Sequence, residues 1–290
     1  MTTNVIDLHS HTRFSDGSTT PAELICLAAS AGARAVAITD HDTVDGLPEG
    51  RRAAQESGIE FVDGVEISAD FQPGTMHILG YCFDPSSKEL NLALEKLRVA
   101  RSERNPQIAS RLRALGLEVH YDEVVSLAGN EVVGRPHFAR VMVTKGYVAS
   151  IKEAFDRFLA KGQAAYVEKH RLSPADSIEL IRKAGGVAIL AHPYQMKLSD
   201  EDTEDQIKRL KDQGLDGIEA IYSRLNSVER EKYISLADRL GMLVSGGSDF
   251  HGSFKPDISL VTGLGDLQVP YEALGKIKAL AALRSRPSLT

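Results

Sequence analysis

The sequence predicts an α/β fold built on a largely parallel β-sheet and interrupted by a small all-helical segment. Short runs rich in Val, Ile and Ala alternate with helical patterns toward both ends of the chain, and such strands are typical of parallel sheets covered on both faces. Between about residues 101 and 166, helical patterns follow one another without a clear strand. In a chain of 290 residues, this alternation indicates a barrel or an open doubly wound sheet formed by residues 1–100 and 167–290, with residues 101–166 as an insertion.

Four strands and two helices are expected before the insertion. Thr20 and Pro21 predict the start of the first helix, because threonine is a common N-cap and proline fits the first helical turn. This helix is expected to end near Gly32, and the second near Gly58. The expected strands are Val5–Leu8, Ala35–Thr39, Phe61–Ile67 and Met76–Tyr81, of which the last two are expected to pair.

The insertion is expected to contain four helices, and three more strands follow it. The helices are Leu90–Leu115, Tyr121–Ala128, Pro136–Lys145 and Ile151–Lys161. Ser173 and Pro174 then repeat the pattern of a helix start. The later strands are Val187–Ala191, Gly217–Tyr222 and Met242–Ser245, separated by helices at Asp202–Gln213 and Ser227–Leu240.

Composition predicts a soluble cytoplasmic protein. Hydrophobic residues make up 42% of the chain and charged residues 26%, as in a globular protein with a buried core. No apolar run approaches the roughly 18 residues of a membrane span, and the N-terminus lacks the features of a signal peptide. Cys26 and Cys82 lie in apolar stretches and are expected to be buried free thiols. We expect no membrane association and no obligate protein partner.

The charge is unevenly distributed along the chain. The net charge is −6, yet residues 101–171 contain 12 Lys and Arg against 8 Asp and Glu. The acidic remainder favours cation binding, and the basic segment favours an anionic substrate. The same basic residues would also fit the solvated face of a helix.

Histidines and carboxylates follow most of the predicted strands. In a barrel the carboxyl ends of parallel strands face one mouth, so these side chains would converge there. Imidazole and carboxylate groups bind Zn²⁺, Mn²⁺ and Fe. A single histidine would fit a polar barrel rim, but six of the nine histidines lie in this set, which exceeds the ligands of one ion. Two or three ions are therefore expected, an arrangement suited to displacement at phosphorus. The set is His9, His11, His41, Glu66, His77, His192, Asp249 and His251.

Asp16 is not distinguished by its spacing. It precedes Gly17 in a loop, where an aspartate is common in a turn, and spacing alone favours that interpretation. Other catalytic signatures are absent from the sequence, including a Gly-x-Ser-x-Gly elbow, a phosphate-binding Gly-x4-Gly-Lys loop and a Gly-x-Gly-x-x-Gly turn.

The sequence resembles the polymerase and histidinol phosphatase (PHP) family. The resemblance implies a distorted (β/α)7 barrel with metals at the carboxyl ends of its strands and a complete set of nine ligands, which adds Asp16 to the eight residues above. The matching stretches are Asp7–Thr12, Ser15–Gly17, Ile38–Asp42, Gly64–Glu66, His77–Gly80, Ala191–Pro193 and Gly247–His251.

The resemblance also implies how the ions are shared. One ion would be held by His9, His11, Glu66 and Asp249; Glu66 would bridge to a second ion on His77 and His192; Asp16, His41 and His251 would hold a third, and some members fill only two sites. Manganese is favoured as the metal, and iron or zinc also suits these ligands. Asp249 and His192 are the candidates for orienting the nucleophile or protonating the leaving oxygen.

The insertion narrows the expected activity. The stretch Gly134–Arg140 resembles the stand-alone, TrpH-like phosphoesterases of the family, which hydrolyse 3′,5′-nucleoside bisphosphates to 5′-monophosphates; some also trim short 5′-phosphorylated RNA. A phosphoric ester hydrolase acting on a nucleotide or short RNA is therefore expected. The alternatives are a histidinol phosphate or sugar phosphate monoesterase, and a metal-binding regulatory module without turnover.

Two groups of residues are candidates for substrate binding. Arg13 and Arg135 suit a second phosphate, because a guanidinium binds two oxygens at once. His137 and Lys169 are further candidates for phosphate. Tyr222, Ser223, Arg224 and Asn226 follow a strand and could contact base or ribose, although each also fits an ordinary loop position.

Overall fold

The computed structural model describes residues 4–128, 133–168 and 171–284. The chain divides into two compact units, which we call the barrel unit (Met1–Leu94 with Arg171–Thr290) and the helical unit (Glu95–His170). The division falls inside helix α3 (Lys88–Ala114), a few residues from the boundaries expected from the sequence. Each unit has its own hydrophobic core.

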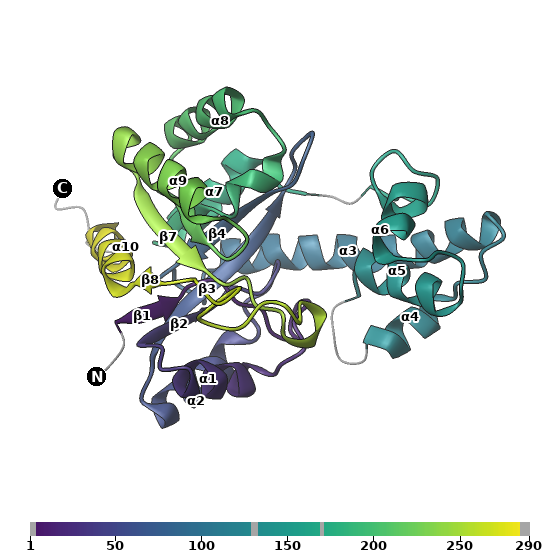
Figure 1. The fold of residues 1–290 in the computed structure, drawn as a ribbon, viewed down its shortest axis with the longest axis horizontal. Coiled ribbons are helices and arrows are strands. Elements are labelled where there is room, and N and C mark those ends of the chain that lie inside the picture. The colour runs from purple at the N-terminus through teal and green to yellow at the C-terminus, as the bar shows by residue number, and fades with distance from the viewer. Residues whose placement is uncertain (1–3, 129–132, 169–170, 285–290) are drawn as a thin grey trace. The chain divides into compact units, whose positions relative to one another are not determined.

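The barrel unit is built on one eight-stranded sheet in the order β7-β6-β5-β4-β3-β2-β1-β8. Helices of the same unit lie around these strands (Figure 1). The sheet curls until the chain at the end of β1 meets β7: the amide of Leu8 donates to the carbonyl of Gly246 at 3.2 Å, and Ser10 forms a parallel bridge with Phe250. The expected barrel-type α/β fold is thus confirmed. The strands are β1 (Val5–Asp7), β2 (Ala35–Ile38), β3 (Glu60–Ala69), β4 (Met76–Tyr81), β5 (Val187–Leu190), β6 (Gly217–Tyr222), β7 (Leu243–Gly247) and β8 (Val269–Pro270).

Two strands depart from the expected parallel arrangement. β4 runs antiparallel to both β3 and β5, because it follows β3 after a connection too short for a crossover. β8, which was not expected, adds two residues antiparallel to β1 and brings the strand number to eight instead of seven. His77 lies near the start of β4, so the reversed strand still carries it to the mouth where the parallel strands end.

Helices of the barrel unit begin where the sequence indicated. The hydroxyl of Thr20 accepts the amide of Glu23 at the start of α1, and Ser173 accepts the amide of Asp176 at the start of α7. α10 was not expected, although its buried positions recur at helical spacing. The helices are α1 (Pro21–Ser30), α2 (Leu47–Ser57), α7 (Pro174–Lys183), η2 (Pro193–Met196), α8 (Asp200–Asp212), α9 (Ser227–Leu240), η3 (Gly252–Phe254) and α10 (Tyr271–Arg284).

The helical unit contains most of α3, followed by α4 (Tyr121–Ala128), α5 (Arg135–Thr144), α6 (Ile151–Ala154) and the π-helical turn η1 (Phe155–Leu159). Its core is formed by apolar residues of these helices, including Ile108, Leu112, Phe138, Met142 and Leu159. Its described residues form no strand. The unit therefore folds around its own apolar contacts.

The described part of the chain has no helix with the length and apolar character of a membrane crossing. Both cysteines are free, but the expectation that they are buried was wrong. Cys26 is exposed, because the buried stripe of α1 runs through Leu24, Ile25 and Ala28 and leaves position 26 outside it. Cys82 is half-buried, and burial raises the pKa of its thiol to about 11.

Candidate metal centre

Glu66, at the centre of the barrel mouth, is surrounded by five imidazoles. Its Oε2 lies 3.3 Å from His9 Nε2 and 3.1 Å from His11 Nε2. The same oxygen lies 3.2 Å from His41 Nδ1. Its Oε1 lies 2.7 Å from His77 Nδ1 and 3.0 Å from His192 Nε2. One carboxylate on β3 thus joins imidazoles contributed by residues at or just after β1, β2, β4 and β5.

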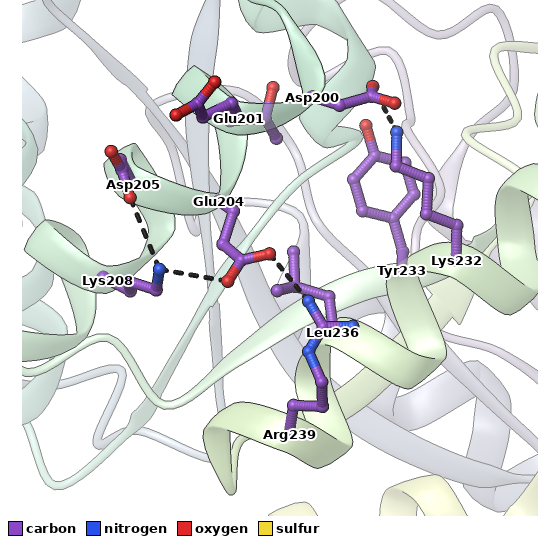
Figure 2. A pocket seen from close by; sticks show the side chains of 10 residues that line it. Asp200, Glu201, Glu204, Asp205, Lys208, Lys232, Tyr233, Leu236 and Arg239 are labelled. Atoms are coloured by element: carbon purple, nitrogen blue, oxygen red, sulfur yellow. Dashed lines mark hydrogen bonds and ion pairs between the residues drawn. The ribbon is translucent and has the colours of Figure 1, made fainter.

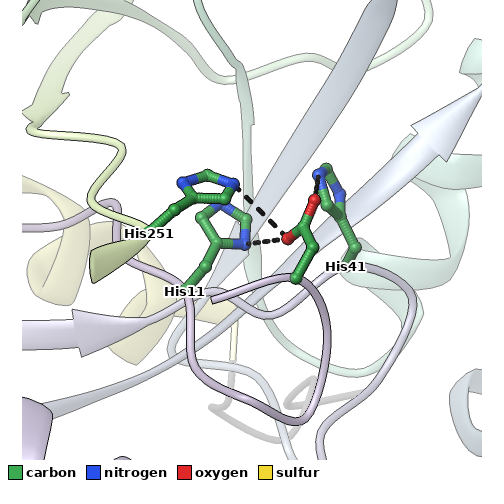
Figure 3. Close-up of side chains that lie close together, drawn as sticks. His11, His41 and His251 are labelled. Carbon is green, nitrogen blue, oxygen red and sulfur yellow. Dashed lines mark ion pairs between the residues drawn. The ribbon is translucent and has the colours of Figure 1, made fainter. Parts of the chain in front are cut away.

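Asp249 and Asp16 extend this arrangement. Asp249 Oδ1 lies 3.5 Å from His9 Nε2 and 3.4 Å from His11 Nε2. The same oxygen is 3.5 Å from His251 Nδ1. The rings of His11, His41 and His251 lie around one carboxylate, that of Asp16, with contacts between 3.4 and 3.8 Å (Figure 3). All nine candidate ligands therefore meet in one cluster, including Asp16, which spacing alone had interpreted as a turn residue.

Ligand atoms of the cluster gather into four overlapping groups, each with its atoms within 4.8 Å of one another. The groups differ in part from the sharing implied by the resemblance: His192 lies with His9 and Glu66, and His41 belongs to two groups. Every group combines imidazole nitrogen with carboxylate oxygen. The groups are His11, Asp16, His41 and His251; His9, Glu66 and His192; His9, His11 and Asp249; and His41, Glu66 and His77.

The cluster fits divalent cations because several of its buried polar atoms lack a hydrogen bond. Glu66 Oε2 and His41 Nδ1 lie within 3.2 Å of each other without the geometry of a hydrogen bond, and His192 Nδ1 has no hydrogen bond with any described residue. The Nε2 atoms of His9 and His11 lie 3.1 Å apart, a contact between two like atoms that only a proton or a cation can make favourable. Buried polar groups without partners are costly, and nitrogen and oxygen ligands suit Mn²⁺, Fe and Zn²⁺.

Protonation in the cluster is strongly perturbed. Burial alone would lower the pKa of His11, but the carboxylates of Asp249 and Glu66 beside it raise the pKa to about 9. Burial lowers the pKa of His41 to about 3, despite the nearby carboxylates of Glu66 and Asp16. Burial alone would raise the pKa of Glu66, yet the surrounding imidazoles hold it well below its ordinary value. The carboxylate is therefore ionised and His41 neutral, the forms in which both bind metals.

Glu219 supports the cluster and was missed by the sequence analysis. It is fully buried in β6; its Oε1 accepts a hydrogen bond from His9 Nδ1 at 2.8 Å, and its Oε2 accepts the amide of His192 at 2.8 Å. In a neutral His9 this bond places the proton on Nδ1, so that Nε2 is the atom available to bind a metal, as in many metal-binding histidines. A charged residue inside an otherwise apolar strand was the signal that could have identified it.

Asp40 fixes the loop that carries Asp16. Its carboxylate accepts the amide and hydroxyl of Thr12 at 2.8 and 2.6 Å and the hydroxyl of Ser15 at 2.6 Å. Gly17 ends this loop so close to the backbone that a β-carbon there would lie 2.2 Å from the carbonyl oxygen of His11. The loop is therefore folded tightly against the strand end that bears His11.

Two cluster residues have backbone angles that side chains rarely adopt. His192 has φ +24° and Asp249 has φ +57°. Residues held in such conformations gather at functional sites, where the surrounding structure maintains them. For His192, the hydrogen bond that its backbone amide donates to the Glu219 carboxylate is part of that support.

The chain is similar to known proteins over most of its length. Residues 7–212 match the model of the PHP domain. The chain belongs to the PHP domain family. It is 37% identical over 247 residues to a 3′,5′-nucleoside bisphosphate phosphatase of Chromobacterium violaceum, covering 85% of this chain and 87% of that one. It is 35% identical to a 5′-3′ exoribonuclease of Haemophilus influenzae, covering 86% and 90%.

A solved structure agrees with this membership. A Bifidobacterium adolescentis protein assigned as a metal-dependent phosphoesterase superposes with a TM-score of 0.81 at 31% identity, over 95% of this chain and 96% of that one. The family, fold and hydrolase class predicted from the sequence are thereby confirmed. Clusters able to bind metal ions accord with a metal-dependent family.

The four residues predicted to contact base or ribose differ in their burial and in their contacts within this PHP chain. Tyr222 is buried and its hydroxyl donates to Asp249 Oδ2 at 2.7 Å. Ser223 is buried, and its hydroxyl has no hydrogen bond with the described residues. Arg224 pairs with Asp257 at 3.0 Å. Asn226 is the N-cap of α9, so helix capping already accounts for its side chain.

Candidates for phosphate contacts lie in both units. Arg13, in the loop before Asp16, is half-buried, and its guanidinium forms no hydrogen bond or ion pair with the described residues. Within the helical unit, Arg135 donates to the carbonyl of Leu159 at 3.1 Å. There, His137 Nδ1 accepts the amide of Gly134 at 3.0 Å. Lys169 lies outside the described residues.

A groove between α8 and α9 is lined by charged side chains, but these form ion pairs with one another (Figure 2). Lys208 and Arg239 both pair with Glu204, at 3.0 and 2.7 Å. Lys232 pairs with Asp200. These opposite charges satisfy one another on the outer helices, so the groove is not a second candidate for metal chemistry.

Proposed function

We propose that this protein hydrolyses phosphate esters of nucleotides with the help of divalent cations, and that its substrate is a 3′,5′-nucleoside bisphosphate, converted to the 5′-monophosphate and phosphate. The observation that carries the proposal is the convergence of six imidazoles and three carboxylates at the mouth of a PHP barrel, with five of the imidazoles around the carboxylate of Glu66. We choose this substrate because the C. violaceum relative, which is similar over 85% of the chain, is a 3′,5′-nucleoside bisphosphate phosphatase.

In this proposal the nine cluster residues are the metal ligands, for two or three ions with manganese favoured. When bound, such ions supply positive charge that stabilises the transferring phosphate and lowers the pKa of water. The chain's own residues orient the reactants. Asp249, held by Tyr222, faces the cluster through Oδ1 and orients the attacking water. His192 has a buried Nδ1 without a hydrogen-bond partner, and this atom is our candidate for passing a proton to the leaving oxygen.

A second candidate function is removal of nucleotides from the 5′ end of short RNA. It is favoured by the H. influenzae exoribonuclease, which matches 86% of this chain. Both reactions cleave a phosphate ester next to a ribose that carries a 5′-phosphate. Arg13 lies in a loop of the cluster, and its guanidinium forms no hydrogen bond or ion pair with the described residues; it is the candidate that would bind that second phosphate.

A panel of substrates separates these functions. The metal-loaded protein is assayed with adenosine 3′,5′-bisphosphate, adenosine 3′-monophosphate, histidinol phosphate, a sugar phosphate and a short 5′-phosphorylated RNA. The proposal predicts that the bisphosphate is hydrolysed with the highest kcat/KM, and that removing the 5′-phosphate reduces this value.

The His9→Ala variant is the control in this panel. It is expected to lose bound metal and activity together. Preference for histidinol phosphate or the sugar phosphate would contradict the substrate assignment. Bound metal without hydrolysis of any substrate would contradict the enzymatic proposal and favour a regulatory module.

A further inference from the structure

Lys255 places a positive charge directly beside the nine-residue cluster. Its Nζ lies 2.6 Å from Asp249 Oδ2. The other oxygen of the same carboxylate lies 3.4 Å from His11 Nε2. The ammonium group and the candidate metal ligands are therefore on opposite sides of a single carboxylate.

Asp249 has a second donor for the oxygen that Lys255 contacts. The hydroxyl of Tyr222 donates to Oδ2 at 2.7 Å, and Tyr222 is only 1% exposed. Its ring also lies edge-on to that of His192, with centroids 5.6 Å apart. Asp249 Oδ2 therefore has a second donor besides Lys255, so its orientation does not depend on the lysine alone.

The position of Lys255 allows a ligand from solvent to reach it. Its side chain is 30% exposed and follows η3 on the loop after β7. That loop is anchored to the loop after β1, because the amide of Ser253 donates to the hydroxyl of Ser18 at 2.8 Å. This bond holds the backbone near the cluster, and the flexible four-carbon stem of a lysine can turn its ammonium group from Asp249 toward a neighbouring ligand.

We propose that Lys255 is a substrate-binding residue whose ammonium group contacts a non-bridging oxygen of the phosphate at the cluster, while Tyr222 keeps Asp249 in place. An ammonium group is a compact charge that suits a phosphate oxygen. The inference rests on the proposed phosphoesterase function. It assigns a residue that neither the motif pattern nor the predicted phosphate-binding candidates included.

The test measures binding of inorganic phosphate to the full-length, manganese-loaded protein by calorimetry, with metal content measured in parallel. Lys255→Met keeps most of the stem and removes the charge. It is expected to weaken phosphate binding roughly 10- to 100-fold, the usual effect of losing a charged hydrogen bond, with metal content unchanged. Lys255→Arg is expected to restore most of the affinity.

Two further variants act as controls. Lys232→Met removes an exposed lysine that pairs with Asp200 in the groove between α8 and α9 and is expected to bind phosphate like the wild type (Figure 2). Tyr222→Phe removes the support of Asp249 and is expected to lower metal content.

Three results would overturn the inference: wild-type protein that binds no phosphate, Lys255→Met that binds it normally, or Lys255→Met that loses metal, which would make the lysine a support for Asp249 alone. Phosphate binding that depends on Lys255 in a protein that hydrolyses no ester would support the inference and refute the proposed function.

Discussion

Replacing Glu219 tests whether the cluster depends on a buried carboxylate that is not itself one of the nine candidate ligands. In the Glu219→Gln variant the side chain keeps its size but has one acceptor oxygen instead of two. It cannot accept both the imidazole N–H of His9 and the amide of His192, which now bond to Oε1 and Oε2 at 2.8 Å each. One buried donor therefore faces an amide nitrogen.

The expected size of the effect follows from this count of lost bonds. A buried donor left without a partner destabilises a protein by about 1–3 kcal/mol, which lowers the midpoint of thermal unfolding by roughly 2–12 °C in a domain of this size. Glu219→Ala leaves both donors unpaired and is expected to have about twice this effect. Because His9 loses its fixed tautomer, metal affinity should fall roughly 10- to 100-fold.

The assay combines thermal unfolding in the presence of a chelator with a titration of manganese into the metal-free protein. Glu231→Gln, at an exposed position of α9, is the matched control and should leave both measurements unchanged. Normal unfolding and normal metal affinity in Glu219→Gln would refute the reasoning, because the two hydrogen bonds would then contribute nothing to the site.

Three other predictions concern loops, caps and thiols. Gly17→Ala should push the loop away from the backbone of His11 and reduce the bound metal by about one ion per chain, measured by elemental analysis, because Asp16 moves with the loop; full metal content would argue against Asp16 as a ligand. Asn226→Ala should destabilise the protein by about 0.5–2 kcal/mol through loss of the α9 cap, with KM unchanged; a raised KM would indicate that Asn226 binds substrate. At pH 8, alkylation should modify exposed Cys26 and spare half-buried Cys82, whose thiolate forms only near pH 11; equal labelling of both thiols would contradict the raised pKa of Cys82.

The sequence was most informative where one local pattern determines a structure. Thr20 and Ser173 identified helix starts, because capping depends only on neighbouring residues. The ligands at strand ends could be grouped in advance, because a barrel brings those ends together whatever the details of packing.

What the sequence did not reveal depends on contacts between distant segments. The direction of β4 follows from the short turn after β3 and from pairing with β5, and the two residues of β8 form a strand only because β1 is beside them. Glu219 and Lys255 act on cluster residues 210 and 6 positions away, respectively, and no spacing rule links those pairs. Asp16 has the spacing of a turn and enters the cluster only through the folded loop.

The central claim is that these separated imidazoles and carboxylates hold divalent cations together. It is tested most directly by anomalous diffraction from crystals of the full-length protein grown with manganese. The account predicts at least two manganese peaks bonded to cluster residues, with Glu66 shared between ions. A fully active protein whose crystals show no metal at these side chains would contradict it.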